Sequence, residues 1–252
     1  MGPAPAALSA GVRAVTTTDV LKSAALLFVF VDHAGYYVFE DETWWRVFGR
    51  LAAPVFFFLI GFARTRSVPW TWLAFGALIT ALDAVGPDGV FAAKLNILLS
   101  FALIRWALPA IERTILRSRA GLIAMVAACL LLAPLAGGVL EYGTQGWLFA
   151  LLGLLHRLGL EAAATDTPRR GATVAVAAVA GSVYVLGEAI SQGFGRVETA
   201  VLAALVTALV IGLLTFRRAE LAQTPPEPLA AMLRFGGRWS LELYAFHLIL
   251  LE

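Results

Sequence analysis

The sequence predicts an all-α, polytopic membrane protein: a single bundle of about nine transmembrane helices with a cytoplasmic N-terminus. Three observations predict this fold. The 252 residues are 60% hydrophobic and only 14% charged, whereas soluble domains carry about 25% charged residues. Apolar windows of roughly 17 to 25 residues, long enough to cross a bilayer, recur along the chain. Basic residues gather on one side of the resulting topology.

The apolar windows define the predicted spans. They run over 20–39, 47–64, 69–85, 92–110, 120–140, 145–160, 172–190, 198–215 and 238–252. Pro, Gly and charged residues separate them, and no separation is long enough for another domain. We expect residues 1–18 to form a flexible cytoplasmic tail and not a signal peptide, because they lack an uninterrupted apolar core. Residues 19–252 then form one transmembrane domain.

The charges predict the orientation, because short cytoplasmic loops are enriched in Lys and Arg. With the N-terminus inside, the inner side collects most of the 19 basic residues. They are Arg13, Lys22, Arg64, Arg66, Arg113, Arg117, Arg119, Arg157, Arg169, Arg170, Arg217, Arg218, Arg234 and Arg238. We therefore expect a multi-pass protein of the cytoplasmic (inner) membrane. The net charge of +2 expresses this bias, and no nucleic-acid partner is predicted. A single cysteine, Cys129, excludes an internal disulfide and a Cys-cluster metal site.

The first span carries the most informative residues. Lys22 and His33 are eleven positions apart, so they share one helix face about 16 Å apart along the axis. Asp32 adjoins His33, and ionisable groups inside a span mark functional sites by default. His33 is a candidate general base, oriented by a carboxylate or carbonyl for which Asp32 is the nearest candidate. In the alternative interpretation, His33 only hydrogen-bonds a neighbouring helix and Asp32 pairs with an arginine.

That arginine is Arg50, which lies a turn deeper in the second span than Arg46. It requires an acidic partner, and Asp32 is at a comparable depth. Arg50 either forms a structural ion pair with Asp32 or orients a carboxylate or carbonyl of the acceptor. In the fourth span, Arg105 either extends to the inner interface or lines a basic vestibule with Lys22.

The last span contains Ser240, Tyr244 and His247, which follow i, i+4, i+7 spacing and form one polar stripe. Such a stripe is expected to face the interior of the bundle. His247 reaches a depth that His33 also approaches, so the two histidines favour a shared substrate cavity, although an interhelical hydrogen-bonding seam would give the same pattern. His156, followed by Arg157, is interpreted as an interfacial residue.

Two segments resemble a known family. They are LKSAALLFVFVDHAG (21–35) and FGRLAAPVFFFLIG (48–61). These segments resemble the TraX family of pilin N-acetylases and, more distantly, other transmembrane acyltransferases that place a basic residue before a histidine of the first helix, with ten residues between the two. The stripe from Ser240 to His247 is similar to their final-helix pattern.

The resemblance implies transfer of an acetyl or short acyl group from cytosolic acyl-CoA to an amine or hydroxyl at or across the membrane. Acyl-CoA would be a co-substrate, with no permanently bound cofactor, and the acceptor a peptide, a sugar or a small amine. Lys22 would lie at the CoA end and His33 at the site of transfer. Arg50, Arg105 and the final-helix stripe complete the expected substrate site, with no metal.

Two other classes of function are compatible with the residues. A small-molecule or proton-coupled transporter would use Asp32, His33, Arg50 and His247 as a polar relay. Transporters often show paired internal repeats, and none is evident here. A structural or assembly subunit would not need so many ionisable groups inside its membrane spans.

Overall fold

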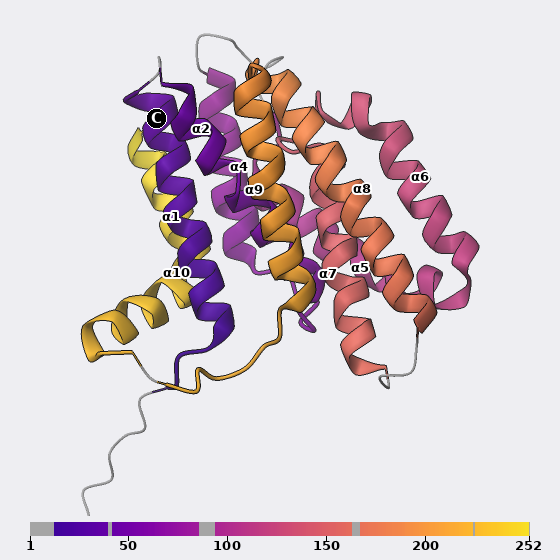
Figure 1. The fold of residues 1–252 in the computed structure, drawn as a ribbon. Helices are drawn as coiled ribbons and strands as arrows, with labels where there is room; N and C mark the ends of the chain where they lie inside the picture. The colour runs from indigo at the N-terminus through magenta and orange to yellow at the C-terminus, as the bar shows by residue number, and fades with distance from the viewer. Residues whose placement is uncertain (1–12, 40–41, 86–93, 163–166, 224, 252) are drawn as a thin grey trace, which may run out of the picture.

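The computed structural model describes residues 13–39, 42–85, 94–162, 167–223 and 225–251, and this part of the chain is helical without a strand. Most of its helices run along one common direction, and the start of α1 and the end of α10 lie at opposite ends of the bundle (Figure 1). The helices are α1 (Thr17–Tyr37), α2 (Thr43–Gly49), α3 (Ala52–Phe62), α4 (Trp70–Val85), α5 (Ile97–Arg117), α6 (Arg119–Ala136), α7 (Gln145–Glu161), α8 (Thr167–Gln192), α9 (Arg196–Thr215) and α10 (Glu227–Leu251).

Each predicted span overlaps a helix in its described residues, with three differences in detail; residues 92, 93 and 252 of the predicted spans lie outside the described residues. The fourth span is shifted along the chain, since α5 runs over Ile97–Arg117. The second span is broken into α2 and α3 at Arg50 and Leu51. Pro54 explains the break, because proline has no N–H with which to bind the carbonyl four residues earlier, that of Arg50. The last helix begins well before residue 238 and has a non-helical residue at Trp239 (φ −109°, ψ 18°), so the predicted span is only its second part.

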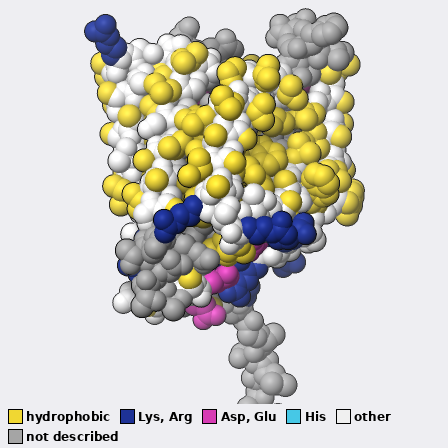
Figure 2. All heavy atoms as spheres, turned by 90° about the vertical axis from the view of Figure 1, so that its right-hand side faces the viewer, with side chains coloured by type: hydrophobic (Ala, Val, Ile, Leu, Met, Phe, Trp, Pro, Cys, Tyr) yellow, Lys and Arg dark blue, Asp and Glu magenta, His cyan; other side chains and the backbone are white. Residues whose placement is uncertain are grey.

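Among the described residues, four helical stretches are long and apolar enough to cross a membrane, fewer than the about nine transmembrane helices predicted. They are Thr43–Phe62, Arg119–Ala136, Arg170–Gln192 and Arg196–Thr215. The second of these is α6, in which Cys129 is the only buried residue although the helix is strongly apolar. Figure 2 shows an outer face that is largely hydrophobic. An apolar helix that faces outward fits a lipid surround, so these helices support a multi-pass membrane protein.

The sidedness of the N-terminus stays a prediction, and the predicted flexible tail, 1–18, falls mostly outside the described residues. The described part of it, from Arg13, leads into α1 through a capping box. The Thr16 hydroxyl accepts from the Asp19 backbone N–H at 3.2 Å, and the Asp19 carboxylate accepts from the Thr16 N–H at 2.9 Å. These reciprocal bonds satisfy two backbone donors that a helix start leaves unpaired, so they fix where α1 begins.

The centre of the bundle is the crossing of α3 and α7. Residues 52–61 of α3 are all buried, as expected for a helix that is apolar on every face. The two helices approach so closely that a Cβ atom on Gly61 would overlap the Ala150 carbonyl, and one on Gly153 would overlap the Phe58 carbonyl. Small residues are the usual means of close helix contact in membranes. Gly61 and Gly153 therefore set the distance between the two central helices.

A second close pair, α1 and α10, joins the two ends of the sequence (Figure 1). Gly237 on α10 leaves room for Asp19 on α1. The Lys22 ammonium donates to the Gly237 carbonyl oxygen at 3.2 Å, and the Ser23 hydroxyl donates to the Leu233 carbonyl oxygen at 3.3 Å. These contacts fix the register of the two helices and so decide which of their residues face each other further along.

The crossing of α3 and α7 gives a stability prediction. Gly61→Ala is expected to destabilise the protein by about 1–3 kcal/mol or more, because its methyl group meets a backbone carbonyl that cannot rotate away. Gly159→Ala on α7 is the matched control, since a Cβ there has nothing within 4 Å. Thermal unfolding in detergent, followed by tryptophan fluorescence, measures both. Equal midpoints for the two variants would contradict a tight crossing at Gly61.

Candidate functional site

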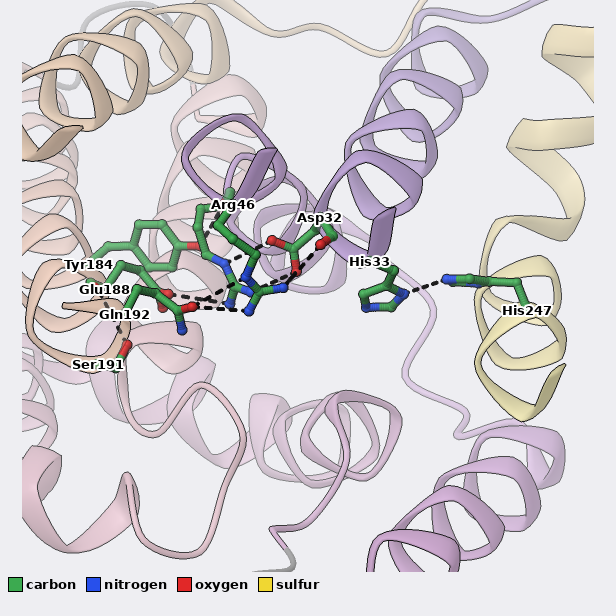
Figure 3. A network of polar contacts seen from close by, with 9 residues as sticks. Asp32, His33, Arg46, Tyr184, Glu188, Ser191, Gln192 and His247 are labelled. Carbon is green, nitrogen blue, oxygen red and sulfur yellow. Dashed lines mark hydrogen bonds and ion pairs between the residues drawn. The ribbon is translucent and has the colours of Figure 1, made fainter. Parts of the chain in front are cut away.

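Two histidines from opposite ends of the sequence meet between α1 and α10. His33 Nδ1 and His247 Nε2 are hydrogen-bonded, and the ring centroids lie 4.6 Å apart (Figure 3). Phe30 packs edge-on against His247 with a centroid distance of 4.8 Å, and the Tyr244 ring lies 6.0 Å from that of His33. The structure thus brings together the two residues that the sequence placed at similar depth.

The surroundings of the pair determine which ring nitrogens carry protons. A carbonyl oxygen only accepts, so His247 Nδ1, 3.2 Å from the Leu243 carbonyl oxygen, carries a hydrogen. In the neutral ring the other nitrogen is then an acceptor, and His247 Nε2 accepts the Nδ1–H of His33. The lone pair of His33 is left on Nε2. A histidine held in this form can act as a general base through Nε2.

Asp32 does not orient His33, which is a correction to the carboxylate–histidine pairing considered above. Its carboxylate accepts from Arg50 Nη2 at 2.6 Å and Nε at 3.1 Å, and from Arg46 Nη1 at 2.9 Å (Figure 3). Adjacent helix residues point about 100° apart. Asp32 accordingly faces α2 while His33 faces α10, and the expected pair of Asp32 with Arg50 is the one that forms.

The Asp32 pair extends into a buried network with α8. Arg50 Nη1 also lies 3.3 Å from the Glu188 carboxylate, and Arg46 donates to Gln192 Oε1 at 3.1 and 3.3 Å. The Tyr184 hydroxyl donates to the Arg50 carbonyl oxygen at 2.5 Å, which is the carbonyl that Pro54 leaves without a helical partner. Buried charges are tolerated when they are paired and hydrogen-bonded. The network locks α1, α2 and α8 together beside His33.

A small chamber of about 20 Å³ lies next to His33. Tyr244, Phe56, Phe101 and Leu241 are among its lining residues. The Tyr244 hydroxyl accepts from Asn96 Nδ2 at 3.0 Å. Tyr244 and Ser240 are both buried, so the polar stripe of the last helix faces the interior as expected. The chamber has room for about one small group or water molecule.

A much larger cavity, of about 950 Å³, occupies the end of the bundle at which α1 begins. Phe56 and Leu241 line both this cavity and the chamber at His33, so the two spaces adjoin there. Lys22 and Ser240 also line the large cavity. Its remaining charged lining residues are Arg13, Asp19, Arg64, Arg105, Arg157, Glu161, Arg217, Arg218 and Arg238. The lining of this cavity is strongly basic, and it meets the lining of the His33 chamber at Phe56 and Leu241.

Two of the basic groups have unused hydrogen-bonding capacity. The Nε–H groups of Arg105 and Arg157 are buried and have no hydrogen-bond partner among the described residues. Arg105 is otherwise held by the Ser67 carbonyl oxygen at 3.1 Å and by the Trp72 ring, whose centroid lies 4.4 Å from the guanidinium carbon. An unpaired buried donor is costly. Because both nitrogen atoms are enclosed by protein, a ligand in the cavity would contact Arg105 through the accessible part of its guanidinium, as a basic vestibule of Lys22 and Arg105 requires.

Asp19, just before the predicted span 20–39, is an acidic residue of the cavity lining. Arg13 Nη2 donates to its carboxylate at 2.6 Å. Burial acts to raise the pKa of Asp19, but the hydrogen bonds from Thr16 and Arg13 outweigh it and hold the pKa below its ordinary value. Asp19 is therefore an anion engaged with its own neighbours.

Several residues of the site were missed or interpreted differently in the sequence. Arg157 was counted among the basic residues of the inner side, but it is buried and bonded to Glu112 and Glu161. Tyr184, Glu188 and Gln192 recur every four residues on α8, and this polar stripe could have indicated the network. His156 is buried, and its Nε2 lies 2.7 Å from the Phe216 carbonyl oxygen, away from the other histidines.

The described residues contain no group of three His, Cys, Asp or Glu side chains that could hold a metal ion. Cys129 is buried and not disulfide-bonded. The chemistry that the arrangement itself offers is proton transfer at the histidine pair and anion binding in the basic cavity.

The buried network gives a second stability prediction. Arg50→Gln is expected to destabilise the protein by about 3–5 kcal/mol, because it leaves Glu188 and part of Asp32 as buried charges without a partner. Arg64→Gln is the control: it removes the ion pair with Glu161, in which the Arg64 side chain is 80% exposed, and should cost less than about 1 kcal/mol. Unfolding midpoints in detergent compare them. Similar decreases of the unfolding midpoint in the two variants would show that the buried network contributes no more to stability than a surface ion pair.

Comparison with protein-family sequence models identifies the family described as TraX protein, matched over residues 17–252. No significant match was found among curated proteins or solved structures. The matched region contains both histidines, the Asp32 network and the lining of the basic cavity from Asp19 onward. Since the match covers nearly the whole chain, this chain belongs to the TraX family.

Proposed function

We propose that this protein is an integral-membrane acyltransferase, which moves an acetyl or other short acyl group from acyl-CoA to an amine or hydroxyl of an acceptor. The acceptor is a peptide, a sugar or a small amine. The protein would lie in the cytoplasmic membrane with its N-terminus and basic cavity facing the cytosol, where acyl-CoA is available. The single observation that carries the proposal is the basic cavity that adjoins the chamber of His33.

The cavity suits the donor. Its volume of about 950 Å³ is at the upper end of the range for small-molecule and cofactor sites. Phosphate groups would be bound by Lys22 and Arg105, both of which line the cavity. The thioester of the donor would then point toward Phe56 and Leu241, beyond which lies His33.

The chemistry of transfer follows from the state of the histidine pair. His33 Nε2 accepts the proton of the acceptor amine or hydroxyl as its nitrogen or oxygen attacks the thioester carbonyl carbon. The C–S bond then breaks, the acyl group stays on the acceptor, and the CoA thiolate leaves and takes up the proton from His33. His247 keeps the proton of His33 on Nδ1 and so keeps Nε2 available.

Asp32 and Arg50 have a different role in this proposal from the one first expected. The Asp32 carboxylate and the Arg50 guanidinium are already paired with each other, and also with Arg46 and Glu188 respectively. They are therefore positioning residues, which hold α1 in place and so fix the depth of His33 in the bundle. Ser240 and Tyr244 line the route and the chamber, where they would contact the acyl group.

A base role for His33 predicts a specific loss. His33→Ala should lower kcat for acyl transfer by about 10²–10⁴-fold and leave the affinity for CoA unchanged, because the phosphate contacts lie at the other end of the cavity. Transfer of label from acetyl-CoA to an amine acceptor, with CoA binding by calorimetry, measures both. Undiminished transfer by folded His33→Ala protein would exclude His33 as the base. Absence of CoA binding and of turnover in the wild type would remove the proposed function itself.

A donor site at Lys22 and Arg105 predicts the complementary result. Arg105→Gln should raise KM for acyl-CoA about tenfold or more, as expected for the loss of one charge-assisted hydrogen bond, with a much smaller change in kcat. Arg113→Gln is the matched control, because Arg113 is an exposed arginine of the same helix that does not line the cavity. An equal change in both variants would indicate a general effect of charge and contradict a phosphate contact at Arg105.

A further inference from the structure

A second large space opens on the opposite flank of the bundle, away from the histidines. It is a groove of about 930 Å³ between α6 and α8, closed on its inner side by α5 and α7. Leu155 and Leu158 of the buried helix α7 form part of its lining. The groove therefore penetrates to the core of the bundle and is more than a gap between surface side chains.

The lining of the groove is divided sharply by polarity. Ser118 and Arg119 lie where α6 begins, and the other lining residues are Gly, Ala, Val, Leu and Ile. None of them is acidic. Figure 2 shows this flank of the protein as a largely hydrophobic face with basic side chains gathered near its lower edge. The groove thus has an apolar body and one cationic end, where Arg119 is exposed.

The length of the groove indicates its occupant. From Arg119 to Leu130, the last α6 residue of the lining, eleven positions at about 1.5 Å each give about 16 Å along the helix axis. The hydrocarbon core of a bilayer is about 30 Å thick, so the groove extends through about one leaflet. A helix of a second copy would cross the whole core, whereas a lipid acyl chain ends at its middle.

The physics of the bilayer requires that such a groove be filled. An empty apolar cleft forfeits the dispersion contacts of its walls, and water gains no hydrogen bonds from Val, Leu and Ile. Acyl chains are the solvent at this depth. At the end of the acyl chain, the lipid headgroup lies beside Arg119, whose guanidinium binds phosphate oxygens. Basic residues at the membrane surface also favour anionic lipids.

We propose that this groove is a binding site for an anionic phospholipid, with one acyl chain between α6 and α8 and the headgroup phosphate on Arg119. The lipid comes from the leaflet at the basic end of the bundle. The site is independent of the acyl-transfer chemistry, and it would attach the otherwise loosely packed helix α6 to the central helix α7.

Native mass spectrometry of the purified protein, in detergent micelles doped with equal amounts of phosphatidylglycerol and phosphatidylcholine, tests the proposal. The wild type is expected to retain one phosphatidylglycerol molecule in preference to phosphatidylcholine. Arg119→Gln should reduce that preference about fivefold, the effect of one basic residue at a membrane surface. Arg113→Gln, on the exposed face of α5 outside the groove, should leave the preference unchanged.

A second variant tests the binding of the acyl chain between α6 and α8 separately from the charge of Arg119. Ala175→Trp places an indole on the exposed α8 wall of the groove and should abolish retention of both lipids while the unfolding midpoint shows a folded protein. Equal retention of the two lipids by the wild type, or an unchanged preference in Arg119→Gln, would overturn the proposal. Displacement of phosphatidylglycerol by equimolar oleate would assign the groove to a free fatty acid instead, and a dimer that Ala175→Trp dissociates would assign it to a second copy.

Discussion

The buried pairing of Asp32 with Arg50 is the interaction on which the rest of the structure depends. A charge in an apolar interior is tolerated only with a partner, and these two groups lie 2.6 Å apart with both side chains 8% exposed. Arg46 and Glu188 extend the pairing to α2 and α8. Since His33 follows Asp32 directly, the depth and rotation of α1 that satisfy the ion pair also decide where His33 points.

The break between α2 and α3 belongs to the same arrangement. Pro54 removes the helical partner of the Arg50 carbonyl, the chain turns at Arg50 and Leu51, and the Tyr184 hydroxyl binds the freed carbonyl. The turn lets the Arg50 side chain reach both Asp32 and Glu188. A proline that would weaken an isolated helix here completes a network that joins three helices.

The close approach of α1 and α10 is the second constraint. Gly237 admits Asp19, Lys22 binds the Gly237 carbonyl, and further along the two helices His33 meets His247. One helix pair therefore connects the basic cavity at one end with the histidine pair near the other. The relation of Lys22 to His33 is set by helix geometry alone, but the relation of His33 to His247 exists only because helices α1 and α10 are packed side by side.

The sequence by itself determined the helical segments, the gathering of arginines at one end, the need of Arg50 for an acidic partner and the inward stripe of Ser240, Tyr244 and His247. These follow from local hydropathy, helical period and the cost of burying charge, which any stretch of chain reveals. Only the tertiary structure decided that the Asp32 carboxylate pairs with Arg46 and Arg50, whereas His247 forms a hydrogen bond with His33. It also decided that Glu188 and Gln192 join the network, and that Arg105 and Arg157 line one cavity. The physical reason is that hydrogen bonds and ion pairs depend on the rotation and register of helices far apart in the chain, which packing fixes and local pattern does not.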